Sequence, residues 1–269
     1  MALALPQQAA GGAWTQSERG YYLKLSGLSF TTTEELDADG ESLPRVGDGE
    51  LTDFGLSAYL EYGLTDRLTL VASIPYKEVE ETRYIGGRQN GVAAMESSSG
   101  FGDLETRLRW LLNTDPVVLS VALGGKIPAG YDVTTSTRVP LGTGEFDGDL
   151  RLLAGRSFYP LPLYTTGELG YRKRGGRFSD EVLFSAEAGY TIDKLMLKAN
   201  LSGVRTLGDC GGASQGGGLI GDQNTFKLSP GLIYSVRPQL QFSLDAISVA
   251  HGCNTATGTT FVVGAAYKR

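Results

Sequence analysis

The feature that most constrains this chain is a period-2 alternation of apolar and polar side chains. Residues 102–112 show it clearly, because apolar side chains alternate there with Asp103, Glu105, Arg107 and Arg109. Successive side chains of a β-strand point to opposite faces, so this pattern predicts a strand with one apolar and one charged face. The core of an ordinary β-sandwich does not accommodate four charges on one face of a strand.

The same alternation recurs along the chain in about twelve segments. Most are longer than the ~5–6 residues of a typical strand and reach the ~9–11 residues that a tilted strand needs to cross a bilayer. We expect strands near 20–32, 49–62, 67–80, 100–112, 116–127, 145–158, 162–174, 180–191, 194–206, 224–236, 238–249 and 258–268.

The connections between these segments alternate between short and long. Gly, Pro, Asn and Asp build the short turns, as turn geometry favours. An even strand count with short turns on one side and long loops on the other is typical of a transmembrane barrel. We therefore predict an all-β chain whose residues 13–269 form a single closed antiparallel transmembrane β-barrel of about 12 strands, with both termini on the periplasmic side. The short turns fall at 63–66, 113–116, 159–162, 191–194 and 236–238, and the long connections near 33–48, 81–99, 128–144, 207–223 and 250–257, with 175–180 as a short exception.

Aromatic residues lie at the short-turn end of most predicted strands. An interfacial girdle of a membrane barrel requires this placement, although aromatic residues also favour strands in general. The set comprises Tyr21, Tyr62, Trp110, Tyr159, Tyr190, Tyr234 and Tyr267.

Composition is compatible with a barrel and argues against some partners. The mean hydropathy of −0.11 fits a barrel, in which only alternate residues face lipid. A secreted soluble β-protein would show the same alternation with its apolar face buried; the long strands and an apolar face nearly free of charge favour the membrane. A net charge of −6 argues against nucleic acid as a partner.

Two further features are the first residues of the sequence and its two cysteines. Residues 1–12 resemble the remnant of a secretory signal peptide, with a short apolar piece and then small residues, or else form a disordered N-terminus. Cys210 and Cys253 both fall in polar loops. They form a disulfide if their Cα atoms approach within ~4.4–6.8 Å, and are otherwise two free thiols.

The charged faces of the strands would point into the barrel. These charges either pair and fill the barrel, or line a path and select solutes. On two strands acidic residues precede basic ones from the loop side, which predicts an acidic ring above a basic one. The predicted lumen-lining residues are Asp53, Glu61, Asp103, Glu105, Arg107, Arg109, Asp147, Asp149, Arg151, Glu168, Arg172, Glu187, Lys198, Lys227 and Asp245.

The sequence offers little for catalysis or metal binding. His251 is the only histidine and lies in a loop beside Cys253, and no nucleophile, base and orienting group can be assigned around it. Together with Cys210 it has no recognisable metal-ligand spacing. We expect no enzyme activity, no metal and no cofactor.

Short hairpin motifs carry a family resemblance. They are EYGLTDRLTL at 61–70, IPY at 74–76 and GFGDLE at 100–105, with GAWTQ at 12–16 similar to the mature start of some relatives. The chain resembles outer-membrane barrels of the meta-pathway of phenol degradation family. One departure is that Tyr267 is followed by two basic residues, whereas many such barrels end on an aromatic residue.

The resemblance implies a bacterial outer-membrane channel or uptake pore for small solutes, often aromatic or hydrophobic. Its partners would be the lipid bilayer, lipopolysaccharide and the barrel-assembly machinery. Apolar cargo would need a side opening, which Pro75 and Pro230 could mark because proline removes a ladder hydrogen bond. The alternative is a closed structural or binding barrel whose outer loops contact lipopolysaccharide, a surface polymer or a protein.

Overall fold

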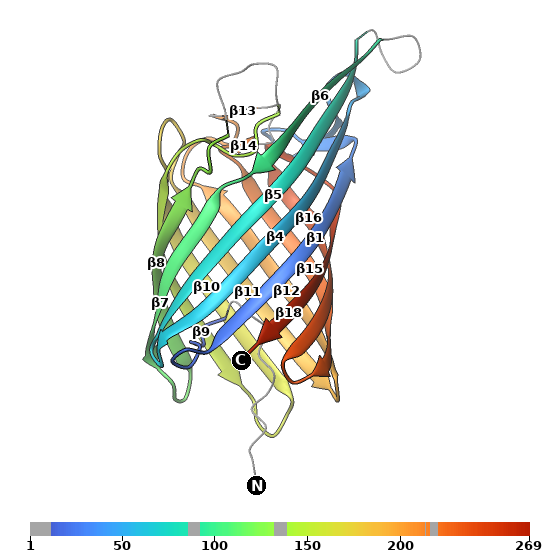
Figure 1. The fold of residues 1–269 in the computed structure, drawn as a ribbon. Helices are drawn as coiled ribbons and strands as arrows, with labels where there is room; N and C mark the ends of the chain where they lie inside the picture. Colours follow the sequence, from blue (N-terminus) through green and yellow to red (C-terminus); the bar gives the residue numbers. More distant parts are fainter. Residues whose placement is uncertain (1–11, 86–91, 132–138, 213, 216–219) are drawn as a thin grey trace.

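A computed structural model describes residues 12–85, 92–131, 139–212, 214–215 and 220–269. They form a closed antiparallel barrel with twelve strands in its wall, β6 and β7 together making one of them (Figure 1). The predicted fold class is confirmed. The wall strands are β1 (Tyr21–Thr32), β4 (Glu50–Thr65), β5 (Leu68–Ile85), β6 (Val92–Phe101), β7 (Leu104–Asn113), β8 (Val118–Ile127), β9 (Asp147–Ser157), β10 (Leu163–Lys173), β11 (Glu181–Ile192), β12 (Leu195–Thr206), β15 (Asn224–Arg237), β16 (Leu240–Cys253) and β18 (Thr259–Lys268).

Pairing between the first and last wall strands closes the barrel. Leu23 of β1 lies opposite Tyr267 of β18, and Tyr21 lies opposite Tyr62 of β4 on the other side. Closure pairs the backbone of both terminal strands, so the membrane-spanning wall has no open edge.

The prediction of a loop at 81–99 is wrong for those of its residues that the structure describes. β5 continues to Ile85, and β6 pairs with it from Tyr76 opposite Phe101 to Ile85 opposite Val92. Figure 1 shows this hairpin extending beyond the barrel rim. The alternation continues past residue 80, with Val79 and Glu81 both buried, and this keeps the segment in the ladder.

Other predicted loops also contain regular structure. The connection at 33–48 folds as β2 (Glu34–Leu36), β3 (Ser42–Pro44) and the 3-10 turn η1 (Val46–Asp48), and β17 (Thr255–Ala256) joins β2. β13 (Ser214–Gln215) pairs with β14 (Ile220–Gly221) in the connection at 207–223. Parts of the predicted loops, at 86–91, 132–138, 213 and 216–219, lie outside the described residues, as does most of the predicted signal remnant.

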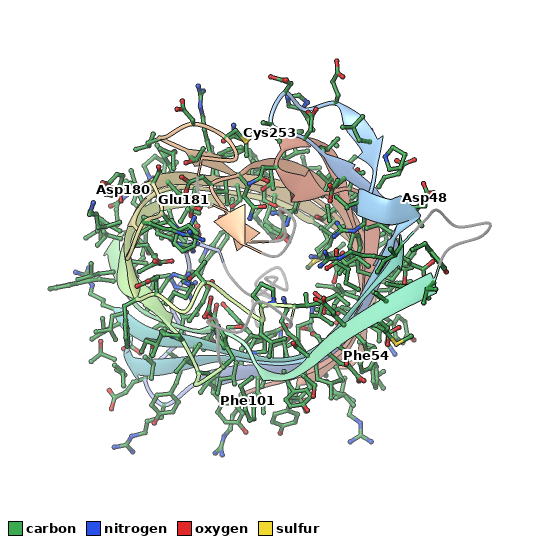
Figure 2. All side chains as sticks on the ribbon, turned by 90° about the horizontal axis from the view of Figure 1, so that it is seen from above. Asp48, Phe54, Phe101, Asp180, Glu181 and Cys253 are labelled. Carbon is green, nitrogen blue, oxygen red and sulfur yellow. A yellow bond between two sulfur atoms is a disulfide. The ribbon has the colours of Figure 1, made fainter. Side chains whose placement is uncertain are left out.

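The outer surface of the barrel is apolar. Looking down the barrel, Figure 2 places Phe54 and Phe101 on its outer side and Glu181 on its inner side. Among the described residues, no helix is long and apolar enough to cross a membrane. A continuous exposed apolar band on a closed barrel is the surface that a bilayer covers. Further exposed residues of this band include Leu25, Leu56, Leu108, Leu123, Leu152, Leu169, Leu244 and Val263.

The aromatic residues of the short-turn end lie on this outer surface. Six of the seven predicted girdle residues are exposed, among them Trp110 at 58% and Tyr159 at 72%. Tyr21 is partly buried, and its ring lies beside that of Tyr267 with 6.0 Å between the ring centroids. Their position at one end of the apolar band is that of an interfacial girdle.

Both strand prolines lie at irregularities of the ladder. Pro75 sits where β5 changes partner from β7 to β6, and its carbonyl accepts a hydrogen bond from the Gly102 N–H. Pro230 lies in a break between the pairs of Leu228 and Gly231 along β16. A side opening at either position stays a prediction.

A disulfide joins the outer loops to the wall. Cys210, which follows β12, is bonded to Cys253 at the end of β16, with the Cα atoms 6.3 Å apart. The bond closes a chain segment of 43 residues and attaches the connection after β12 to the barrel rim.

The two tryptophans allow a test of this orientation. Trp110 is exposed on the apolar band, whereas Trp14 contacts Tyr164, whose side chain is buried inside the barrel. In vesicles of brominated lipid, we expect strong fluorescence quenching in the Trp14→Phe variant and weak quenching in the Trp110→Phe variant, because bromine quenches by contact. Equal quenching of both tryptophans would contradict the assignment of inner and outer faces.

Candidate functional site

Residues 12–16, the N-terminal segment, enter the barrel at its short-turn end. The Ala13 side chain has no exposed surface and packs against Ala122 and Leu153 of the inner wall. The Ser120 hydroxyl donates a hydrogen bond to the Ala13 carbonyl. The segment is therefore held against β8 and β9.

The segment also forms hydrogen bonds with strands β4, β5 and β7. Arg109 Nη1 donates a hydrogen bond of 2.7 Å to the carbonyl of Gly12. The Gln16 side-chain amide donates to Glu61 Oε2 at 2.7 Å, and the Gln16 N–H donates to the Thr69 hydroxyl at 2.8 Å. Contacts with β4, β5, β7 and β8 hold the segment across the turn end and narrow the lumen there.

The wall leaves room for the tryptophan of this segment. Trp14 packs edge-to-face on Tyr164 with 6.2 Å between ring centroids. A Cβ atom at Gly155 would lie 2.7 Å from the Trp14 ring, so only glycine allows the ring to approach β9 this closely.

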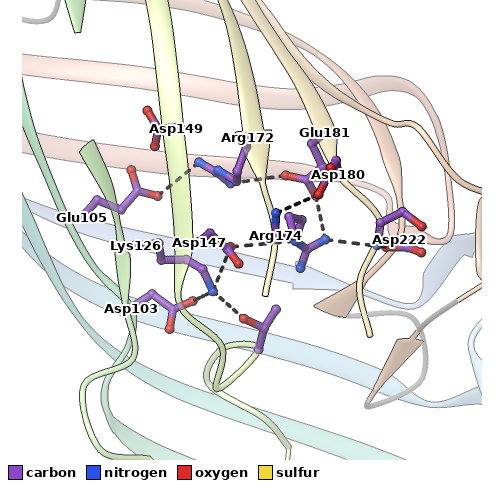
Figure 3. A network of polar contacts seen from close by, with 12 residues as sticks. Asp103, Glu105, Lys126, Asp147, Asp149, Arg172, Arg174, Asp180, Glu181 and Asp222 are labelled. Carbon is purple, nitrogen blue, oxygen red and sulfur yellow. Dashed lines mark hydrogen bonds and ion pairs between the residues drawn. The ribbon is translucent and has the colours of Figure 1, made fainter. Parts of the chain in front are cut away.

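A polar cluster lines the loop end of the barrel (Figure 3). Lys126 Nζ lies 2.9 Å from Asp103 and 3.3 Å from Asp147, and it also donates to the Thr143 hydroxyl. The Tyr131 hydroxyl donates to Asp103, and burial together with this hydrogen bond raises the pKa of Tyr131. Lysine and tyrosine thus satisfy both oxygens of the Asp103 carboxylate.

Arg174 is the second cation of this cluster and is almost fully buried. Its guanidinium lies 2.7 Å from Glu181, 3.8 Å from Asp222 and 3.8 Å from Asp147. It also lies over the Phe178 ring, 4.5 Å from the centroid. One arginine therefore compensates charge from three neighbouring segments.

A second group of ion pairs continues toward the turn end. Asp149 contacts Arg107 at 3.0 Å and Arg151 at 2.6 Å. Arg107 also pairs with Glu105 at 2.5 Å, and Arg151 with Glu168 at 2.5 Å. These charges, on β7, β9 and β10, form a ladder across the inner wall in which Arg107 of β7 reaches Asp149 of β9 across β8.

The predicted acidic ring above a basic ring is wrong. Arg172 lies 3.8 Å from Glu105 and 3.4 Å from Glu181, and it stands at the loop end together with Lys126 and Arg174. These cations come from β8 and from the end of β10, so they lie at the level of the acidic groups and neutralise them.

The opposite side of the interior holds a third group. Asp245 lies 2.8 Å from Lys198 and 3.6 Å from Lys24, and Lys198 lies 3.6 Å from Glu187. A Cβ atom at Gly231 would lie 2.2 Å from Asp245 Oδ1. Glycine at this position makes room for the ion pair.

Four more predicted residues lie elsewhere on the inner wall. Arg109 pairs with Glu61 at 2.8 Å beside the N-terminal segment. Asp53 pairs with Lys77 at 3.4 Å near the loop end. Lys227 is partly buried on β15 and forms no ion pair with any acidic residue in the described ranges.

All the predicted lumen residues are thus buried or partly buried on the inner side, and their part in a solute path stays a prediction. Sequence reasoning missed five charged partners. Each falls on the inner face by the same period-2 rule, so the signal was present in the predicted strands. They are Lys24, Lys77, Lys126, Arg174 and Glu181.

Charge pairing also occurs outside the barrel wall. Asp180 accepts hydrogen bonds from the Tyr171 hydroxyl, from the Arg174 backbone N–H and from Lys173 Nζ. These bonds lower the pKa of Asp180 to about 2. The Lys173 side chain is 73% exposed, in contrast to its neighbour Arg174 at 5%.

The barrel is similar to solved structures of outer-membrane proteins. An outer-membrane channel from Pseudomonas putida F1 matches with a TM-score of 0.69 over 98% of this chain and 100% of that channel, at 14% identity. This chain has the fold of an outer-membrane channel. The NanC porin matches with a TM-score of 0.55 over 92% of this chain and 100% of the porin, at 7% identity. Protein-family models and curated proteins gave no match to the sequence.

Arg174 and Lys173 form a matched pair for testing the loop-end cluster. Arg174→Met would leave three acidic groups without their shared cation, so we expect it to lower the free energy of unfolding by about 3–5 kcal/mol. Lys173→Met removes only an exposed pair and should have little effect. Urea titrations of the lipid-embedded protein measure both, and equal midpoints for the two variants would show that the buried cluster does not stabilise the barrel.

Proposed function

We propose that this chain is a bacterial outer-membrane channel that takes up small solutes. The observation that carries the proposal is the combination of a closed apolar-coated barrel with a charged interior, a cavity at the loop end and a short peptide segment across the turn end. Twelve strands give a backbone radius of about 12 Å. Side chains reduce this to a passage suited to small molecules.

The ion pairs support a shaped passage. Each of these wall charges is held by a partner on its own strand or on the next strand but one. Placed in a partly hydrated lumen, such charges determine which solutes enter. The N-terminal segment then forms the narrowest part of the path.

The solute class follows from the sequence resemblance. Membership of the meta-pathway of phenol degradation family, and with it uptake of aromatic or hydrophobic compounds, is part of this proposal. Contacts with lipopolysaccharide and with the barrel-assembly machinery are likewise proposed, from the exposed apolar band and the strand architecture.

A second candidate is a closed barrel whose outer loops bind lipopolysaccharide, a surface polymer or a protein. The dense ion pairing inside and the segment at the turn end favour this alternative. The folded loop region, with its short strands β2, β3 and β17 and its disulfide, would provide the binding surface. Ionic conductance distinguishes the two functions.

Single-channel conductance of the refolded protein in planar bilayers tests the channel. We expect defined conductance steps in the native chain and a severalfold larger conductance in Trp14→Ala, because this change removes the ring that packs the N-terminal segment onto Tyr164. Trp110→Ala, which removes an aromatic ring from the outer surface, is the matched control and should leave the conductance unchanged.

Heat-modifiable migration in gels would verify that all three proteins are folded. Folded protein that gives no conductance, with or without Trp14, would reject the channel and favour the closed binding barrel. An equal conductance of the native and Trp14→Ala proteins would reject the N-terminal segment as the narrowest point.

A further inference from the structure

The loop end of the barrel contains a cavity that the ion-pair clusters do not fill. Its volume is about 280 Å³. Strands β1, β4, β5, β15, β16 and β18 all contribute to its walls, so it lies inside the barrel beneath the outer loops. It has room for a molecule with one aromatic ring or a short alkyl chain.

Part of the cavity wall is apolar. Leu51 and Val79 are 2% and 5% exposed and belong to a buried cluster that also packs Phe30. Ile247 and Val249 of β16 line the cavity as well. Ion pairs cover the inner wall around Asp149 and Asp245, whereas this apolar surface is a place where an apolar group can leave water.

The charged groups of the cavity do not balance. Asp53, Lys77 and Lys227 are the charged residues among its described lining, and two lysines against one aspartate leave one net positive charge. Asp53 and Lys77 pair with each other at 3.4 Å. Lys227 is left without an acidic partner in the part of the chain that the structure describes.

Polar groups that could assist an anion lie near Lys227. Thr225 is two residues away on the same inner face of β15 and also lines the cavity. Lys227 lies opposite Val249 in the strand ladder, and both residues line the cavity beside Thr225. An anion that also carries an apolar group stabilises a cation in such a place most, because it pairs the charge and covers the aliphatic wall.

We propose that this cavity binds small amphipathic anions, in which one carboxylate pairs with Lys227 and an aromatic or short aliphatic body packs against Leu51, Val79 and Phe30. This inference rests on the proposed uptake function and specifies its substrate class. A neutral analogue lacks the group that pairs with Lys227, and a cationic analogue places like charges together. The site therefore selects monocarboxylates over both.

Equilibrium dialysis of the full-length protein in lipid nanodiscs, with benzoate as the probe, tests the proposal. Benzyl alcohol and benzylamine are the neutral and cationic comparisons. We expect benzoate to bind most tightly and Lys227→Met to weaken it about tenfold or more, as loss of a hydrogen-bonded charge pair implies. Benzyl alcohol binding should not change in that variant.

Two further variants complete the design. Lys227→Arg retains the positive charge and should retain benzoate affinity, which separates loss of the charge from misfolding. Lys173→Met removes an exposed lysine outside the barrel and should bind benzoate as the native chain does. Benzoate binding that is no tighter than benzyl alcohol binding, or that is equal in native and Lys227→Met proteins, would overturn the site.

The failures of the two proposals remain distinguishable. Lys227-dependent benzoate binding by a protein that gives no conductance would support the site and reject the channel. Stable conductance together with Lys227-independent benzoate binding would support the channel and reject the site.

Discussion

The closed hydrogen-bond ladder is the constraint on which the rest of this structure depends. A bilayer offers no partners for backbone N–H and C=O groups, so a chain that crosses it with strands must pair every strand on both sides. The contact between β1 and β18 meets this requirement. Closure also fixes the two surfaces of the protein, because alternate residues of each strand must then face either lipid or the interior.

Closure creates an interior that must accept charge, and ion pairs along and across the inner wall make this possible. An isolated buried charge is costly, whereas a hydrogen-bonded pair largely offsets the loss of hydration. Asp149 between Arg107 and Arg151, and Asp245 between Lys24 and Lys198, are compensated in this way. Glycine at position 231 makes space for one of these pairs, so backbone and charge are matched locally.

The two ends of the barrel differ in what occupies them. At the turn end, residues 12–16 bind to the wall through Arg109, Glu61 and Ser120, and they narrow the interior. At the loop end, the wall around Lys227 leaves a cavity with an apolar side and a net positive charge. A solute that enters from outside would meet the cavity before the narrow end, which is the order that capture followed by passage requires.

The sequence by itself determined the fold class, the approximate positions of most wall strands and the face on which the charged residues of those strands lie, because the period of a strand assigns every side chain to one of two surfaces. It did not predict that β5 and β6 extend into 81–99, because the polar residues of this segment resemble those of a loop. Nor could it pair Lys126 with Asp103 and Asp147, or bring the Gly12 carbonyl to Arg109. These contacts depend on strand register and on the path of the N-terminal segment inside the barrel, and the period-2 alternation specifies neither. Only the tertiary structure decided them.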